Sequence, residues 1–339
     1  MSTEAQRESV ALADVLRASL DSVTSATALQ SILAAQEQGR AAATLGEVRN
    51  RADVLVCWGV DPSLRYPRYW SRYAPEPAGI HVPAGRASRK VVAVDIGDSR
   101  GPADADLRLA IPPPDEVATL TTLAASVRLP PSPQSGFGGP GKADPTYGRA
   151  RELGPVVTAG QYVVFVADAE PQDGRDAGGP AALITLTQAL NGTTRCALSI
   201  LRAGGNRSGA DACLTSQTGY PTAVDFARGY PRYRPFDGTA GARLARGEVD
   251  AVLIIGSADL IPTGLASAMA RVSHAAIGPR ASASVFASGV ALVDTAVAGI
   301  HEAGTALRMD DVPLPVRKCL AGPAEATVVV RALRERINR

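Results

Sequence analysis

Cysteine and histidine are the side chains that most often hold metal ions, and this chain contains few of either. Its four cysteines stand singly and form no Cys-x-x-Cys pair; they are Cys57, Cys196, Cys213 and Cys319. Its three histidines are dispersed and lack the His-Glu-x-x-His spacing of a zinc site. We therefore expect no iron–sulfur cluster, no zinc knuckle and no other metal site in this chain.

Residues that could bind phosphate or attack an ester or amide bond form only weak motifs. The segment Gly204–Gly209, GGNRSG, looks like a phosphate-binding loop, but no Gly-Lys-Ser/Thr follows it. No Gly-x-Ser-x-Gly sequence is present, so a hydrolase triad has no nucleophile. The residue types give no catalytic centre.

The most distinctive segment is 217–235, QTGYPTAVDFARGYPRYRP. It contains the triplet Gly-Tyr-Pro twice, ten residues apart, at Gly219–Pro221 and Gly229–Pro231. Glycine permits backbone angles that other residues avoid, and proline fixes φ. The pattern predicts an ordered loop rather than a helix or strand, and long ordered loops are usually functional.

Composition limits the class of protein. A chain of 339 residues is expected to form two domains, and its 45% hydrophobic content can build a substantial core. The net charge of +2 argues against a nucleic-acid partner. The N-terminal segment has no apolar stretch typical of a signal peptide, and the cysteines are unpaired, so a cytoplasmic location is expected. The least charged stretch, Ala281–Ile300, contains Asp294 and predicts a buried strand pair rather than a membrane span.

Apolar patterning predicts the elements that must position any site. Short apolar runs predict buried strands at Val54–Cys57, Val91–Asp95, Gln161–Val166, Arg195–Ile200, Ala251–Ile255 and His274–Ile277. Helices are expected at Glu4–Leu20, Asp115–Val127, Gly179–Leu190, Gly241–Arg246, Gly264–Val272 and Ala324–Ile337. Alternation of strands and helices implies an α/β protein with parallel sheets. We expect two doubly wound α/β domains, residues 1–128 and 149–339, joined by a Pro/Gly-rich linker at residues 129–148.

Several long and unusual segments carry a family resemblance. They are Thr44–Pro62, Tyr66–Tyr73, Gly204–Asp211, 217–235 and Val293–Lys318, the last containing Glu-x-x-Gly-Thr-Ala and Arg-Met-Asp. Together they resemble the B subunit of formylmethanofuran dehydrogenase, in the molybdopterin oxidoreductase superfamily. The sequence is most similar to the shortened bacterial version found in the formyltransferase/hydrolase complex of methylotrophs. The resemblance implies the two central α/β domains of that superfamily without its iron–sulfur domain.

The resemblance also implies that the redox centre is lost. Active members hold tungsten or molybdenum through a Cys or selenocysteine followed by His, and here Ser25–Ser31, SATALQS, stands at that place. Neither Thr27 nor Ala28 supplies the soft thiolate of such a site. In active relatives the turns matching Trp58–Pro62 and Gly256–Asp259 hold a pterin dinucleotide. Because Asp95–Arg100 lacks the family's Pro-Arg-x-Thr pattern, a structural relic is favoured over nucleotide binding, and no cofactor is expected in this chain.

The implied function is that of a non-catalytic, structural subunit in the oxidation of formaldehyde to formate. The complex moves a formyl group from tetrahydromethanopterin to a methanofuran-type carrier and hydrolyses it. The implied partners are formyltransferase subunits and an amidohydrolase-like hydrolytic subunit, which is expected to bind a divalent metal. One alternative is a redox-active molybdopterin formylmethanofuran dehydrogenase subunit whose iron–sulfur centre lies in another subunit. Another is an independent nucleotide-binding protein.

Candidate contact residues follow from the same resemblance. We expect a carrier or interface contact from Asn206, Arg207, Tyr220, Arg228, Tyr230 and Arg232. Methanofuran-type carriers in this family bear glutamate chains, which a cationic groove would hold through charge-assisted bonds. The groove would comprise Arg65, Arg68, Arg72, Arg202, Arg207, Arg228, Arg232 and Arg234. The alternative is that these arginines are solvated or pair with Asp61, Asp211, Asp225 and Asp237.

Overall fold

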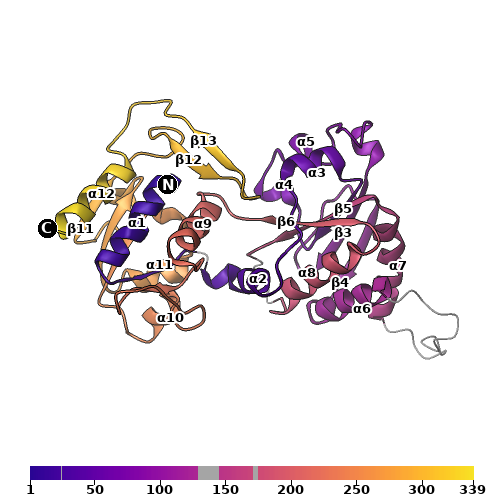
Figure 1. Cartoon of the computed structure of the whole chain (residues 1–339), viewed down its shortest axis with the longest axis horizontal. Helices are drawn as coiled ribbons and strands as arrows, with labels where there is room; N and C mark the ends of the chain where they lie inside the picture. Colours follow the sequence, from indigo (N-terminus) through magenta and orange to yellow (C-terminus); the bar gives the residue numbers. More distant parts are fainter. Residues whose placement is uncertain (24, 129–144, 171–174) are drawn as a thin grey trace. The chain divides into compact units, whose positions relative to one another are not determined.

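The chain folds into two compact α/β units (Figure 1). The computed structural model describes residues 1–23, 25–128, 145–170 and 175–339. One unit combines Met1–Leu29 with Ala203–Arg339 and is called here the discontinuous unit. The other, Gln30–Arg202, is called the central unit. Both contain a parallel sheet, which confirms the predicted α/β class.

The discontinuous unit is built on three parallel strands in the order β11-β10-β9. The strands are β9 (Ala251–Ile255), β10 (Ser273–Gly278) and β11 (Ala291–Asp294). Its helices are α1 (Thr3–Val15), α9 (Arg207–Thr218), α10 (Ala240–Ala245), α11 (Thr263–Met269) and α12 (Ala326–Ile337). Leu12 of α1 and Val330 of α12 pack against Ile277 on one side of β10, while Met269 of α11 packs with Ala276. Neighbouring residues of a strand point to opposite faces, so helices cover both faces of this sheet.

Two small antiparallel sheets complete this unit. Strand β1 (Ser19–Leu20) pairs with β7 (Val224–Asp225), which pairs with β8 (Arg232–Tyr233). Strand β12 (Gly304–Leu307) pairs with β13 (Pro313–Val316). The expectation that residues 217–235 contain no helix or strand is therefore wrong in part, because β7 and β8 lie there and α9 ends at Thr218. The two strands are two residues long, which leaves the rest of the segment as loop.

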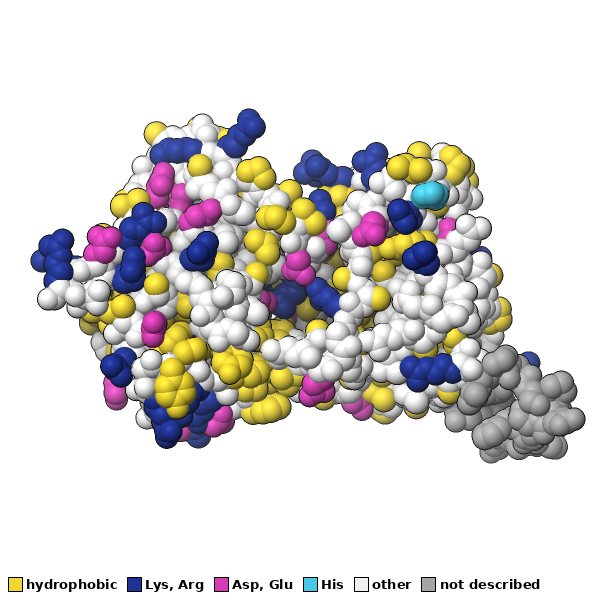
Figure 2. All heavy atoms as spheres, viewed as in Figure 1, with side chains coloured by type: hydrophobic (Ala, Val, Ile, Leu, Met, Phe, Trp, Pro, Cys, Tyr) yellow, Lys and Arg dark blue, Asp and Glu magenta, His cyan; other side chains and the backbone are white. Residues whose placement is uncertain are grey.

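Large apolar side chains remain exposed on the discontinuous unit. They include Tyr230, Phe236, Val285, Val290, Leu320 and Val328, each more than half exposed. In the left half of Figure 2, hydrophobic side chains lie in groups beside arginine and lysine side chains on this unit. Residues 281–300, expected as a buried strand pair, contain one strand, β11, whose Val293 is partly exposed. Among the described helices, none has both the length and the apolar character needed to span a membrane.

The central unit is built on five parallel strands in the order β4-β3-β2-β5-β6. The strands are β2 (Val54–Trp58), β3 (Lys90–Ile96), β4 (Leu107–Ile111), β5 (Tyr162–Asp168) and β6 (Arg195–Leu201). The helices are α2 (Ser25–Gln38), which crosses the boundary between the units, α3 (Leu45–Arg51), α4 (Pro62–Arg65), α5 (Tyr69–Arg72), α6 (Glu116–Arg128), α7 (Pro145–Ala159) and α8 (Gly179–Leu190). Every residue of β2 is buried, as its unbroken apolar sequence VLVCW predicts for a strand covered on both faces.

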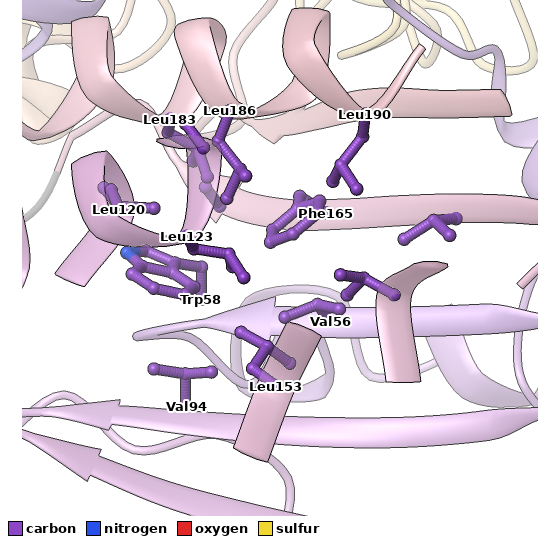
Figure 3. Close-up of a cluster of buried hydrophobic side chains, with 14 of the residues drawn as sticks. Val56, Trp58, Val94, Leu120, Leu123, Leu153, Phe165, Leu183, Leu186 and Leu190 are labelled. Carbon is purple, nitrogen blue, oxygen red and sulfur yellow. The ribbon is translucent and has the colours of Figure 1, made fainter. Parts of the chain in front are cut away.

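Helices α6, α7 and α8 supply the apolar layer on one face of this sheet. Figure 3 shows Leu120 and Leu123 of α6 and Leu186 of α8 beside Trp58 and Phe165 of the strands. The Trp58 and Phe165 rings lie 6.2 Å apart between centroids. This cluster fixes the carboxyl end of β2, which is where a doubly wound sheet accepts ligands.

The winding of the central sheet reverses between β2 and β5. From β2 the chain adds β3 and β4 on one side, and then crosses to add β5 and β6 on the other. Ligands of such sheets bind outside the carboxyl ends of the strands at this reversal. The residues that follow β2 and β5 are therefore the candidate site of this unit.

The two compact units differ from the expected domain boundaries. Strands β5 and β6 lie within residues 149–339 but pair in the same sheet as β2, so the central unit ends at Arg202. Helix α1 belongs with residues 203–339, although it lies within residues 1–128. Of the linker expected at residues 129–148, residues 129–144 lie outside the described residues, and 145–148 begin α7.

Polar side chains tie the N-terminal segment to the rest of its unit. Asn206 Nδ2 donates to the Met1 carbonyl at 3.1 Å, and it lies within 3.3 Å of oxygens of Thr3 and Gln6. Its Oδ1 accepts the Leu307 amide at 2.7 Å. The φ of Asn206 is 62°, a left-handed conformation that asparagine tolerates better than most residues. One side chain thus joins α1, α9 and β12.

We predict that Asn206→Ala lowers the free energy of local opening of α1 by about 2–4 kcal/mol, because it removes several partly buried hydrogen bonds and adds left-handed strain. Native-state hydrogen exchange of the α1 amides measures this quantity. Asn206→Gly keeps the hydrogen-bond loss but relieves the strain, so its effect is expected to be smaller. Asn50→Ala removes one exposed bond to the Gly46 carbonyl and serves as the control. A loss below about 1 kcal/mol for Asn206→Ala would contradict the role given to this residue.

Candidate functional site

The place where the resemblance puts a metal-binding cysteine lies in α2. Thr27 is exposed there, Ala28 is fully buried, and neither carries sulfur. Burial raises the pKa of Cys57 and Cys213, and raises the pKa of Cys196 to about 12, so these residues remain thiols at neutral pH. Within the described parts of the chain, no three His, Cys, Asp or Glu side chains are grouped to hold a metal ion. The donor set present does not fit a tungsten or molybdenum site.

Charged side chains meet near the winding reversal of the central unit. Arg65 of α4 pairs with Asp168 at the end of β5, with Nη2 2.8 Å from Oδ2. Arg202 Nε lies 3.7 Å from Glu170 Oε1, and the Tyr66 hydroxyl donates to the Arg202 carbonyl. These contacts place the carboxylates that follow β5 beside two arginines of the expected groove.

A cavity of about 550 Å³ lies within the discontinuous unit. Turn residues that follow parallel strands border it: Gly256 and Ser257 after β9, and Pro279 after β10. Most of the remaining lining is aliphatic and includes Val10, Leu20, Leu214, Ile254, Ile261 and Met269. A cavity of this size and character can accept a small organic ligand or an inserted partner side chain.

Glycines allow the two turns at this cavity to approach each other. A Cβ on Gly278 would lie only 1.9 Å from the Gly256 carbonyl oxygen, so no side chain fits there. Gly256 has φ +122°, a conformation that L side chains rarely adopt. The turns at Gly256–Asp259 and Gly278–Arg280 therefore form one close-packed edge of the cavity.

Two of the predicted contact residues, Asn206 and Arg207, border the same cavity. The Asn206 side chain is engaged with α1 and β12, so bracing is its observed role. Arg207 Nη2 lies 3.4 Å from the Leu260 carbonyl. Arg207 is half-buried and therefore presents a cation at the rim of a largely aliphatic space.

The other four predicted contact residues lie on the loop with the two Gly-Tyr-Pro triplets. Tyr220 stacks on Tyr233, with ring centroids 5.0 Å apart and planes 9° from parallel. Arg228 and Tyr230 are exposed, and 53% of Tyr230 is accessible to solvent. Arg232 Nη2 pairs with Asp225 Oδ2 at 2.7 Å. The loop thus contains an internally packed half and an exposed half.

Three arginines converge on the buried carboxylate of Asp225. Arg234 and Arg243 lie 3.6 and 3.8 Å from Asp225 Oδ2, in addition to Arg232. Arg234 also pairs with Asp237. Pairing with Asp225 and Asp237, the alternative to the groove, is therefore observed for Arg232 and Arg234. Asp61 instead caps α4 by accepting the Ser63 amide at 2.8 Å.

The shared groove itself stays a prediction. Arg65, Arg68, Arg72 and Arg202 belong to the central unit, whereas Arg207, Arg228, Arg232 and Arg234 belong to the discontinuous one. Arg68, Arg72 and Arg228 are exposed.

Sequence reasoning did not identify Asp21, a buried carboxylate of the discontinuous unit. It accepts hydrogen bonds from the Ser22, Ala223 and Ala240 amides and from the Ser25 and Thr222 hydroxyls. Burial raises the pKa of Asp21 although these bonds favour its charged form. Its main partners lie about 200 residues away, so no local pattern could have signalled this role.

The chain is similar to known proteins in both sequence and fold. No protein-family model matches the sequence. The B subunit of the tungsten-containing formylmethanofuran dehydrogenase 2 of Methanocaldococcus jannaschii is 33% identical over 319 residues, covering 93% of this chain and 72% of the relative. The protein of the same name from Methanococcus maripaludis is 30% identical over 326 residues, covering 94% of this chain and 73% of that relative.

A solved structure shares the fold. It is a chain of the formyltransferase/hydrolase complex (FhcABCD) from Methylorubrum extorquens, crystallised with methylofuran. The TM-score is 0.77 at 20% sequence identity, and the match covers 100% of this chain and 89% of the other. At this level of identity the likeness supports the α/β fold.

We predict that Asp225→Asn lowers the free energy of unfolding by roughly 2 kcal/mol at neutral pH, because three arginines lose their shared partner. Burial alone would raise the pKa of Asp225, but the Ala227 amide and Arg232 hold it below its ordinary value. The folded chain therefore binds this proton less tightly than the unfolded chain. The stabilisation is present above the ordinary aspartate pKa of about 4 and is lost as pH falls through the lower folded value.

Chemical unfolding followed by circular dichroism at several pH values tests this. The gap between the original chain and Asp225→Asn is expected to close as pH falls below about 4. Asp237→Asn, at an exposed partner of Arg234, is the control and is expected to change little. A gap that is constant with pH would show that the loss comes from packing rather than charge.

Proposed function

The chain belongs to the family of the formylmethanofuran dehydrogenase B subunit, and from that premise we propose that it is a non-catalytic subunit of a formyltransferase/hydrolase complex. The observation that carries the proposal is the donor set at the former metal position. The resemblance puts the family's sulfur ligand at Thr27 and Ala28 of α2, which carry no sulfur, and burial keeps Cys57, Cys196 and Cys213 protonated. Such a chain keeps the family fold without the group that performs redox chemistry.

The proposed complex oxidises one-carbon units by transferring and hydrolysing a formyl group. Transfer belongs to the formyltransferase subunits, and hydrolysis belongs to an amidohydrolase-like subunit that binds a divalent metal. The fold likeness to a chain of FhcABCD, over the full length of this chain, supports this assignment. The tungsten-containing relatives favour the redox-active alternative, but the side chains near α2 do not fit it.

The exposed half of the paired Gly-Tyr-Pro loop is the proposed contact with a neighbouring subunit. Tyrosine and arginine are the side chains that most often anchor protein interfaces, and Arg228 and Tyr230 are both exposed here. The packed half, through Tyr220 on Tyr233 and Arg232 on Asp225, holds that surface in one conformation. A preformed surface binds with a smaller loss of conformational entropy than a flexible one.

Arg207 at the cavity and the exposed arginines are the proposed contacts for a polyglutamylated methanofuran-type carrier. Arg68, Arg72 and Arg228 are the members of the groove that are most exposed to solvent. Carboxylates of a glutamate chain would exchange along such side chains, since exposed pairs are individually weak. The chain would in this way assist delivery between the active sites of its partners.

We predict that Arg228→Ala with Tyr230→Ala weakens the affinity for the hydrolytic partner by about tenfold or more, because interface arginines and tyrosines are frequent hot spots. Both side chains are exposed, so the fold is expected to remain intact. Dissociation of the co-expressed complex on dilution, and formate production by that complex, are the measurements. We also expect the isolated chain to aggregate and to become soluble with the hydrolytic partner, since it exposes apolar side chains.

The matched control replaces an exposed arginine and an exposed apolar residue outside the loop. Arg51→Ala with Ile80→Ala fits, because the backbones meet nearby through the His81 amide and the Asn50 carbonyl, 2.9 Å apart. Equal affinity of the loop variant and the control would remove the loop from the interface. A soluble monomer with no affinity for the hydrolytic partner would contradict the proposed function itself.

A further inference from the structure

A buried ion pair stands at the carboxyl end of β2. Glu116, the first residue of α6, is fully buried. Its Oε1 accepts the Trp58 Nε1 proton at 2.8 Å, and its Oε2 accepts the Arg175 Nε proton at 3.0 Å. Arg175 Nη2 donates to the same carboxylate. Only 10% of the Arg175 side chain is exposed. Both charges are therefore almost completely removed from water, and each is compensated by the other.

The pair fills space that two glycines leave open. Gly59 follows β2 with φ +62°, and a Cβ at that position would lie 3.0 Å from Arg175 Nη1. Gly179 begins α8, and a Cβ there would lie 3.3 Å from Glu116 Oε1. Side chains at either position would press on one half of the pair. The arginine therefore lies against the glycine turn, and the carboxylate lies against the start of a helix.

The pair lies at the place where doubly wound folds commonly bind ligands. Strand β2 flanks the winding reversal of the sheet, where doubly wound folds bind their ligands. In such folds a glycine after the first strand lets the backbone approach a phosphate group. Here the space beside Gly59 is filled by the Arg175 guanidinium, which is paired with the Glu116 carboxylate.

Figure 3 shows that the carboxyl end of β2 is packed into the hydrophobic core. The Trp58 ring lies beside Leu120 of α6 and near Val94 of β3. Its indole nitrogen is committed to Glu116. The adjacent Asp115 is also paired, with Arg149 Nη1 2.9 Å from its carboxylate. The acidic start of α6 thus has an arginine for each carboxylate.

We propose that the central unit retains an anion-binding crevice, formed by Arg175 and the Trp58 indole nitrogen, that is occupied from within by the Glu116 carboxylate. The internal carboxylate excludes phosphate-bearing ligands from the winding reversal. Removal of that carboxylate leaves an unpaired buried guanidinium, which binds a small carboxylate or phosphate from solution. This inference deepens the non-catalytic function proposed above, because it gives the central unit a specific reason not to bind a nucleotide.

The test is rescue by an added anion. In the full chain, assembled with its partner subunits, Glu116→Ala should speed hydrogen exchange of the β2 and α6 amides by about tenfold or more. Millimolar acetate or inorganic phosphate should restore the protection in a saturable manner, beyond the effect of sodium chloride at equal ionic strength. In a Trp70→Phe background, the emission of Trp58 should follow the same saturation curve.

Three variants separate charge from packing. Arg175→Ala should respond to guanidinium ion and not to acetate, because it lacks the cation. Glu116→Gln preserves the size of the side chain and should show no response to acetate. Asp106→Ala breaks a more exposed pair, with Arg86 Nη2 3.0 Å from Asp106 Oδ1, and should also show no response.

Two results would overturn the inference. One is a loss of hydrogen-exchange protection in Glu116→Ala that neither acetate nor phosphate restores. The other is binding of inorganic pyrophosphate by the unaltered chain with a change in Trp58 emission. Neither result bears on whether α2 holds a metal site. Tungsten or molybdenum bound to this chain would overturn the proposed function but not the rescue.

Discussion

Buried and half-buried polar groups that bond to residues far along the chain hold this fold together. Asp21 joins the N-terminal segment to the residues just before β7 and to the start of α10, and Asn206 joins α1 to β12. Glu302 accepts the Ser2 hydroxyl at 2.9 Å and the Thr327 hydroxyl at 2.6 Å. An unpaired group at any of these positions would cost about twice what a single hydrogen bond contributes. Satisfying them requires residues 1–29 to pack with residues 203–339, and this leaves residues 30–202 as a separate insertion.

The sequence predicts the parts of this fold that depend on local pattern. The run VLVCW forms β2 as expected, and the helix at Gly179–Leu190 begins and ends as predicted. The sequence did not predict the discontinuous unit, because hydrogen bonds to Asp21 and Asn206 span about 200 residues. The same reason applies to the site. The glycine turns were recognisable, but the pairing of Glu116 with Arg175 and of Asp225 with three arginines joins segments that carry no common motif.

The space at the carboxyl ends of the parallel strands is filled in one unit and left open in the other. In the central unit, the space beside Gly59 is filled by an internal ion pair. In the discontinuous unit, a cavity of about 550 Å³ remains beside Gly256 and Pro279. In both units a glycine leaves room for neighbouring groups that a side chain at that position would displace. Under the proposed function, the chain keeps the family fold and uses its surface for contacts with other subunits instead of for redox chemistry.

The content of metal and pterin in the native complex tests this account most directly. The complex is purified without added metal, its formate production is measured, and molybdenum, tungsten and pterin are then quantified per copy of this chain. The account predicts active complex with molybdenum, tungsten and pterin far below one per chain. Stoichiometric molybdenum or tungsten bound to this chain, with activity that depends on it, would contradict the account.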